Sequence, residues 1–274
     1  MRTNLDIPDI RELRLFDACV TFGRVVRAGT PEAVTAGNVL QVLDKYDIVE
    51  ALVHHVEARL NTPRDLGNRR LLREIEDVSR LHPVWVLDPP QPSSPDAARA
   101  MVEEMLAAGV KAARLMMAVA PPLHWVWKDL LGALEAHRVP CLLDFADPRY
   151  RGNAGSTMGS PDAFALHRLR ECALAHPELP LILSHVCCGV GLEFPVLPLV
   201  RECPNVHLDI LGIIKYWRTV ATEAGPERVL FATGMPFVEP ATFISNAQYA
   251  RRLSLEDKKK ICGGNLRRLL GGVR

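Results

Sequence analysis

Short apolar segments alternate with longer amphipathic segments along the whole chain. The apolar segments are rich in Val, Ile and Leu, a pattern typical of parallel strands that are buried on both faces. We predict one strand in each of eight such segments, at residues 13–23, 48–55, 84–89, 110–117, 139–145, 179–185, 205–211 and 228–237.

The segments between the strands predict helices. Residues 96–109 begin at an Asp and end at a Gly, and residues 126–138 and 160–176 place Leu and Ala at helical spacing. Crossover helices join parallel strands, so eight such units predict an α/β fold, a single (β/α)8 barrel domain over residues 1–274. A doubly wound open sheet is the alternative. It usually has fewer strands, and no Gly-x-Gly-x-x-Gly follows the first strand.

Charge and composition argue against a nucleic-acid-binding protein and a membrane protein. The 33 Lys and Arg nearly balance the 32 Asp and Glu, so no overall field favours nucleic acid or an anionic membrane. The N-terminus lacks the apolar run of a signal peptide, no apolar run is long enough to span a membrane, and the seven cysteines form no Cys-x-x-Cys pair. We expect a cytoplasmic protein with reduced thiols that binds a small molecule and forms a homodimer.

Polar residues stand at the ends of the predicted strands. The active site of a (β/α)8 barrel lies at the C-terminal ends of its strands, and polar groups that end apolar strands cost desolvation unless they are paired or used. The sequence therefore predicts one pocket lined by residues from this set: Cys19, Thr21, His54, His55, Asp88, Arg114, Asp144, His185 and Asp209.

Several ordered motifs resemble the amidohydrolase superfamily, in the branch of aminocarboxymuconate-semialdehyde decarboxylase and related decarboxylases, hydratases and lactonases. The first-strand motif "FDACVTFG" is similar to the Asp-Ala-His-x-His-x-Gly of that branch, and "RVLFATGMPF" is similar to its Arg-Ile-Leu-Phe-Gly-Ser-Asp-x-Pro-Phe. Further matching segments are "GVKAARL", "HRVPCLLDF", "LPLILSHVCCGVGLEFP" and "KKKICGGNLRRLLG". The resemblance spans about residues 13–271 and implies a barrel with hydrolase or lyase chemistry on a small carboxylate or carbonyl compound.

The resemblance also implies a divalent metal, held by two first-strand histidines, a fifth-strand histidine and an eighth-strand aspartate. The corresponding residues here are Cys19, Thr21, Asp144 and Gly234, and none is the family's ligand. His185 matches the family's sixth-strand histidine, a helper in proton transfer. We therefore expect a degenerate metal site with no cofactor, and a pair of catalytic residues, His185 as acid/base and Asp144 as its partner.

Other interpretations of these residues remain open. Cys19, Asp144 and His185 could form a substitute three-ligand zinc site, because each is a legitimate zinc ligand. Cys187 and Cys188 follow His185 and could supply a Cys-His nucleophile. His54 and His55 are adjacent on a strand and point to opposite faces, so at most one enters the pocket.

Candidate substrate-binding residues come from Arg114 and from the loops. The glycine-rich segment 146–162 carries Arg149 and Arg151, whose forks match carboxylates, and Trp125 and Trp217 could form walls of a pocket. Three functions follow: an enzyme that uses His185 and little or no metal, a non-catalytic barrel that binds a ligand or partner, and a metallohydrolase with substitute ligands.

Overall fold

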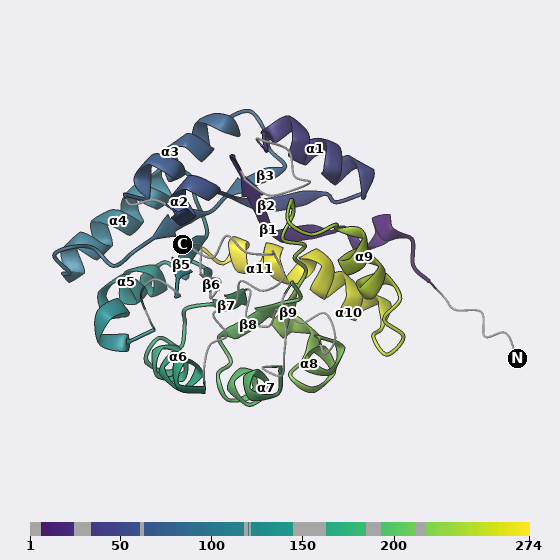
Figure 1. Ribbon diagram of the computed structural model, residues 1–274. Coiled ribbons are helices and arrows are strands. Elements are labelled where there is room, and N and C mark those ends of the chain that lie inside the picture. The colour runs from purple at the N-terminus through teal and green to yellow at the C-terminus, as the bar shows by residue number, and fades with distance from the viewer. Residues whose placement is uncertain are drawn as a thin grey trace, which may run out of the picture.

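The computed structural model describes residues 7–24, 34–60, 63–117, 120, 122–144, 163–184, 193–211 and 217–274. Strands in these parts of the chain alternate with helices and gather in the centre of the molecule, with the helices around them (Figure 1). The strands are β1 Phe16–Phe22, β2 Glu50–His55, β3 Leu81–Pro83, β4 Trp85–Leu87, β5 Ala113–Met116, β6 Cys141–Asp144, β7 Leu181–Ser184, β8 Val206–Asp209 and β9 Val229–Leu230.

All neighbouring strands are parallel, in the orders β1-β2-β3 and β4-β5-β6-β7-β8-β9. Two seams join these groups. At the first, only Val84 separates β3 from β4, and its backbone N–H donates to the carbonyl of Val53 in β2 at 2.8 Å. At the second, the Ala18 N–H of β1 donates to the Phe231 carbonyl just after β9 at 2.9 Å. The predicted α/β barrel is confirmed.

The helices begin at residues that can cap them. Hydroxyls of Thr35, Ser94 and Ser254 accept hydrogen bonds from backbone N–H groups of the first turns of three helices, which satisfies donors that have no partner inside a helix. The helices are α1 Ala36–Lys45, α2 Val56–Leu60, α3 Asp65–Glu74, α4 Pro95–Ala107, α5 His124–Ala136, α6 Ala163–Ala175, α7 Glu193–Glu202, α8 Trp217–Glu223, α9 Ala241–Gln248, α10 Leu255–Lys259 and α11 Asn265–Gly271, with short helical turns at Ile10–Leu13, Pro226–Arg228 and Lys260–Gly264.

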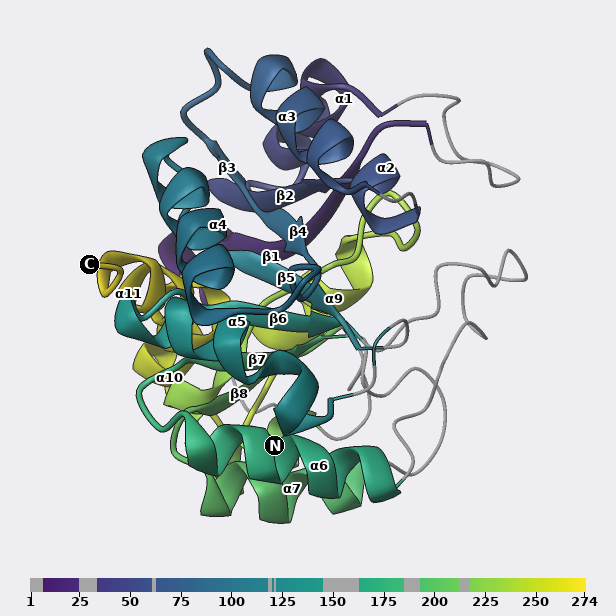
Figure 2. The ribbon, with the colours of Figure 1, turned by 90° about the vertical axis from the view of Figure 1, so that its left-hand side faces the viewer.

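One end of the barrel is covered by the C-terminal helix. Helix α11 lies at one end of the strands in the side view of Figure 2. Arg267 of this helix donates through Nε to Glu50, the first residue of β2, at 2.7 Å. Helix α11 also contacts β1 and β9, so it covers the N-terminal ends of the strands, and their C-terminal ends form the opposite end, where the active sites of such barrels lie.

Each of the eight predicted strand segments contains a strand, and the structure refines two of them. The third predicted segment contains β4, and a further short strand, β3, precedes it at Leu81–Pro83. The polar His82 and Pro83 interrupt the apolar pattern there, so the pattern indicated only residues 84–89. The eighth is only Val229–Leu230, since the chain beyond it leaves β8 and hydrogen-bonds to β1. Two predicted helices are observed within two residues of their expected bounds as α4 and α5, and the third corresponds to α6.

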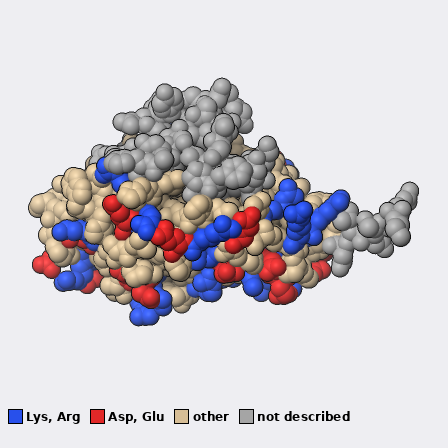
Figure 3. Space-filling view, turned by 90° about the horizontal axis from the view of Figure 1, so that it is seen from below, with Lys and Arg blue, Asp and Glu red and all other residues tan. Residues whose placement is uncertain are grey.

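Lys and Arg side chains lie beside Asp and Glu side chains on the described part of the face seen in Figure 3, in keeping with the near-zero net charge. Among the described helices, none combines the length and the apolar character needed to span a membrane.

Candidate active site at the mouth of the barrel

The centre of the candidate site is the carboxylate of Asp144, the last residue of β6, which is fully buried. Arg114 of β5 donates from Nη1 to Asp144 Oδ2 at 2.7 Å. Arg59 of α2 forms an ion pair with the same oxygen, with Nη2 at 2.9 Å. Two guanidinium groups therefore share one buried carboxylate oxygen.

Strand register explains this meeting. Met116 of β5 pairs with Asp144 of β6, so Arg114, two residues earlier on the same face, lies one step deeper in the barrel and reaches up to the carboxylate. Helix α2 begins at Val56 directly after β2 ends at His55. This abrupt strand-to-helix junction carries Arg59 over the strand ends toward Asp144.

The polar residues of β1 face the same interior. The Arg114 guanidinium contacts Cys19 as well, with Nη2 at 3.3 Å from Sγ. Thr21 Oγ1 lies 3.2 Å from His54 Nε2, on the neighbouring strand in direct register. Burial raises the pKa of the Cys19 thiol to about 12, against the opposing charge of Arg114, so Cys19 is a neutral thiol near pH 7.

A second carboxylate, Asp17, fastens the last strand of the barrel to the first. Its Oδ1 accepts from the backbone N–H groups of Cys19 and Thr233, each at 3.0 Å, and the Thr233 hydroxyl bonds to Oδ2. Burial raises the pKa of Asp17 to about 7, although these hydrogen bonds lower it and the nearby charge of Asp209 raises it further. Asp209 itself accepts from the Ser184 hydroxyl at 2.6 Å.

Gly234 lies beside Cys19, as the sequence predicts, because its backbone N–H donates to the Cys19 carbonyl at 3.0 Å. Its φ of +70° falls in the left-handed region that favours glycine. A Cβ at this position would lie 2.6 Å from Cδ1 of Leu211, so side-chain packing fills the space that a residue at 234 would need.

The two histidines of β2 point to opposite faces, as predicted. His54 contacts Thr21 inside the barrel, whereas His55 is buried on the other side with Nε2 3.8 Å from a carboxylate oxygen of Glu74 in α3. Burial lowers the pKa of His55, against the raising effect of Glu74 and Glu57. His55 is therefore no part of the cluster at the mouth.

The remaining predicted site residues divide into two groups. Trp217 is buried at the start of α8, and Trp125 is 71% exposed at the start of α5. His185, Arg149, Arg151, Cys187 and Cys188 lie outside the described residues. No local pattern pointed to Arg59, because an arginine in a short helix acquires this role only through the fold.

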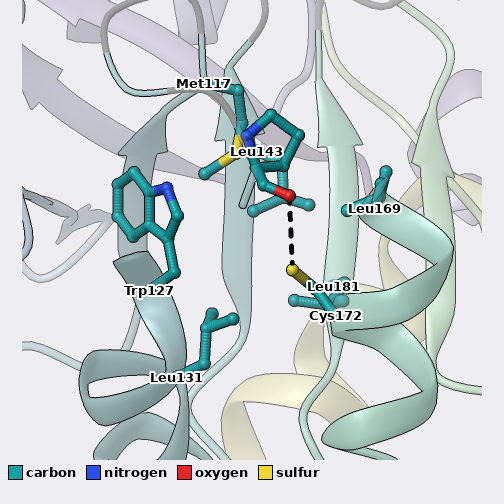
Figure 4. Close-up of a pocket in the computed structure, with 8 residues that line it drawn as sticks. Met117, Trp127, Leu131, Leu143, Leu169, Cys172 and Leu181 are labelled. Atoms are coloured by element: carbon teal, nitrogen blue, oxygen red, sulfur yellow. Dashed lines mark hydrogen bonds between the residues drawn. The ribbon is translucent and has the colours of Figure 1, made fainter. Parts of the chain in front are cut away.

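The small apolar cavity in Figure 4 does not extend this site. It lies between helices α5 and α6 and the strands, where Trp127, Leu143 and Cys172 are among its lining residues. Its volume is about 10 Å³, close to the space of one water molecule. The Cys172 thiol points to the Pro122 carbonyl at 3.7 Å, and burial raises its pKa to about 12. This cavity is a packing void.

A larger hollow of about 330 Å³ lies at the opposite end of the barrel. Three of its polar groups bind one another, since Glu50 accepts from Arg267 and contacts His82 Nε2 at 3.2 Å. Catalytic residues of (β/α)8 barrels lie at the C-terminal ends of the strands, and this hollow borders the N-terminal ends. The Asp144 cluster is therefore the stronger candidate site.

Comparison with known proteins supports the same fold. A family model described as Amidohydrolase matches residues 23–272. The chain belongs to the amidohydrolase family. A search of the curated proteins finds no match.

Solved structures of this family are similar over nearly the whole barrel. A dihydroxybenzoic acid decarboxylase from Polaromonas, with bound manganese and the inhibitor 2-nitroresorcinol, is 17% identical with a TM-score of 0.72, over 94% of this chain and 96% of that one. A 5-carboxyvanillate decarboxylase from Sphingomonas paucimobilis is 14% identical with a TM-score of 0.72, over 96% and 100% of the two chains. A 2,6-dihydroxybenzoate decarboxylase from Rhizobium is 18% identical with a TM-score of 0.69, over 94% and 98%. At these identities the likeness establishes the fold.

The described residues do not fit the divalent metal that the family implies. In the parts of the chain that the structure describes, no three His, Cys, Asp or Glu side chains group in a way that could hold a metal ion. The position of the first-strand ligand holds a neutral thiol, Cys19, and Asp144 is bound to two arginines. A metal ion at this place would compete with the Arg114 guanidinium for both groups.

Proposed function

We propose that this amidohydrolase-family barrel acts on a small carboxylate or carbonyl compound, by hydrolysis or by C–C or C–O lyase chemistry, with a degenerate metal site. The observation that carries the proposal is the pair of guanidinium groups held by Asp144 at the C-terminal ends of the strands. Arginine forks match carboxylates in geometry and charge. The decarboxylases of similar fold act on carboxylated aromatic compounds, which agrees with such a substrate class.

The proposed roles follow from position in the barrel. His185 follows Ser184, the last residue of β7, and we assign it the acid/base role because this segment resembles the one that carries the family's sixth-strand histidine. Asp144 holds the forks of Arg59 and Arg114 in place. The Arg59 side chain is 11% exposed while Arg114 is fully buried, so Arg59 is the group that can turn toward the carboxylate of a substrate.

The remaining proposals concern the whole chain. A single domain over residues 1–274 that forms a cytoplasmic homodimer suits a barrel of this family. Loop residues Arg149 and Arg151, with Trp125 and Trp217, are the further candidates for contacts with the substrate.

The alternative function is a non-catalytic barrel that binds a ligand or a partner. The neutral Cys19 thiol and the arginine-bound Asp144 favour it, because neither group activates water as a metal centre does. Both functions use the same pocket, and turnover distinguishes them.

A screen of small carboxylates, lactones and amides with the wild-type protein and His185→Ala tests the proposal. We expect the substitution to lower turnover by about 10² or more, since general acid–base catalysis contributes that much. His167→Ala is the matched control, because His167 is an exposed histidine of α6 that forms an ion pair with Glu171 of the same helix. Turnover that survives His185→Ala contradicts the assigned role, and binding without any turnover favours the non-catalytic barrel.

Arg59→Met tests the substrate class separately. We expect weaker binding of a carboxylate and unchanged binding of the corresponding primary amide, because only the carboxylate carries the charge that the guanidinium recognises. Equal losses for the acid and the amide would show that Arg59 does not recognise the carboxylate.

A further inference from the structure

The guanidinium of Arg114 lies between two positions that bind metal in the family. It is fully buried, donates to Asp144 Oδ2 at 2.7 Å and contacts Cys19 Sγ at 3.3 Å. By the resemblance of the strands, these are the positions of a fifth-strand and a first-strand histidine ligand. The charge of Arg114 is permanent: burial lowers its pKa, but its interactions with Cys19 and Asp144 together raise it by more, and the net pKa lies above the ordinary arginine value.

A second, independent observation concerns the position of the eighth-strand aspartate. Gly234 has a positive φ that side chains rarely adopt, and the side chain of Leu211 fills the space that a Cβ would enter. This position therefore has no side chain to bind a metal, and the packing of Leu211 leaves no space for one.

We propose that Arg114 has replaced the divalent metal as the resident cation of this barrel and that its guanidinium keeps metal ions out. A divalent ion near a fixed guanidinium in a buried site is repelled strongly, because charges within a few ångströms interact far more strongly there than in water. The carboxylate of Asp144, neutralised by two arginines, offers such an ion little compensation. A guanidinium has only N–H donors and no open coordination position. The inference rests on the proposed function only for the identity of the site.

Metal binding after removal of the guanidinium tests this inference. Wild-type protein, Arg114→Met and Arg114→Gln are dialysed against zinc or manganese, and bound metal is measured by elemental analysis after the fold is checked by circular dichroism. We expect wild type to bind no stoichiometric ion and both variants to retain measurably more zinc or manganese than wild type, because Cys19 and Asp144 are then no longer engaged by Arg114. The gain should disappear when Asp144→Asn is added.

Arg228→Met is the matched control. Arg228 is a part-buried arginine, but it donates to the backbone carbonyls of Cys203 and Val206, at the N-terminal end of β8 and away from Asp144 and Cys19. Its loss should bring no metal.

Two results would overturn the inference. One is a wild-type protein that binds one equivalent of zinc which Cys19→Ala removes. The other is a folded Arg114 variant that retains no more zinc or manganese than wild type. If Arg114→Met does not fold, Arg114→Gln is used instead, because its amide keeps a polar group near Asp144. The measurement of metal in the wild-type protein does not depend on either variant. Because the readout is bound metal, a failed activity screen and a failed metal test remain distinguishable.

Discussion

Replacing Asp144 by Asn removes the one negative charge that Arg59 and Arg114 share. Arg59 is 11% exposed and can turn toward water, whereas Arg114 is fully buried and cannot. The substitution leaves the Arg114 guanidinium as an uncompensated buried charge, because an amide can accept its hydrogen bond but supplies no opposite charge.

The magnitude follows from comparing two ion pairs of nearly equal length. Arg114 and Asp144 lie 2.7 Å apart and are both 0% exposed, while Arg138 and Glu178 lie 2.6 Å apart and are 40% and 63% exposed. Removing one partner of a buried pair typically costs about 3–5 kcal/mol. An exposed pair contributes about 1 kcal/mol or less.

Thermal and urea unfolding of Asp144→Asn and of the control Glu178→Gln measure this difference. For a chain of this size we expect Asp144→Asn to lower Tm by about 6–20 °C and Glu178→Gln by no more than about 4 °C. The double variant Asp144→Asn/Arg114→Met should recover a large part of the loss, because no buried charge is then unpaired. An Asp144→Asn loss no larger than that of Glu178→Gln would refute the reasoning.

Three further predictions concern other buried groups. In urea unfolding, Gly234→Ala should destabilise the fold by more than the roughly 1–2 kcal/mol of left-handed strain, because the new Cβ meets Leu211. Gly109→Ala is the control for strain alone, since Gly109 has a positive φ with open space around it, and equal losses of stability would rule out the packing effect. Burial, with two nearby arginines, lowers the pKa of His207 to about 3, so its contribution to stability is present above pH 6.5 and is lost as pH falls toward 3. His207→Gln should therefore reduce the fall in the free energy of unfolding between pH 6.5 and pH 3. Burial raises the pKa of Asp17 to about 7, so its contribution to the free energy of unfolding is present below about pH 4 and declines as pH rises to 7. Asp17→Asn should abolish that decline, and an unchanged dependence of the free energy of unfolding on pH would show that Asp17 is ionised in the fold.

The fold was predictable because its main signals are local. Apolar runs that are buried on both faces mark parallel strands, and capped amphipathic segments mark the helices between them. The irregularities were less visible. A register shift between Asp17 and Val20 interrupts the ladder of β1 with β2, and the eighth strand leaves β8 for β1. Both depend on contacts between the two ends of the chain, which no local pattern contains.

The sequence predicted several residues of the candidate site but not the hydrogen bonds and ion pairs between them. Strand ends identified Cys19, Arg114 and Asp144, because the topology brings these ends together. The sequence suggested Asp144 as the partner of His185, which lies outside the described residues, and nothing in the sequence indicated that Asp144 binds two arginines. Which partner a buried carboxylate takes depends on side-chain reach across the barrel, and Arg59 reaches it only because α2 begins without a loop after β2.

Elemental analysis of the purified wild-type protein, expressed in medium supplemented with zinc and manganese, tests the central claim most directly. The account predicts no stoichiometric divalent metal at the mouth of the barrel, because the Arg114 guanidinium already supplies the cation there. One equivalent of metal that is retained through dialysis and lost in Cys19→Ala would contradict it and would support a metallohydrolase with Cys19, Asp144 and His185 as substitute ligands.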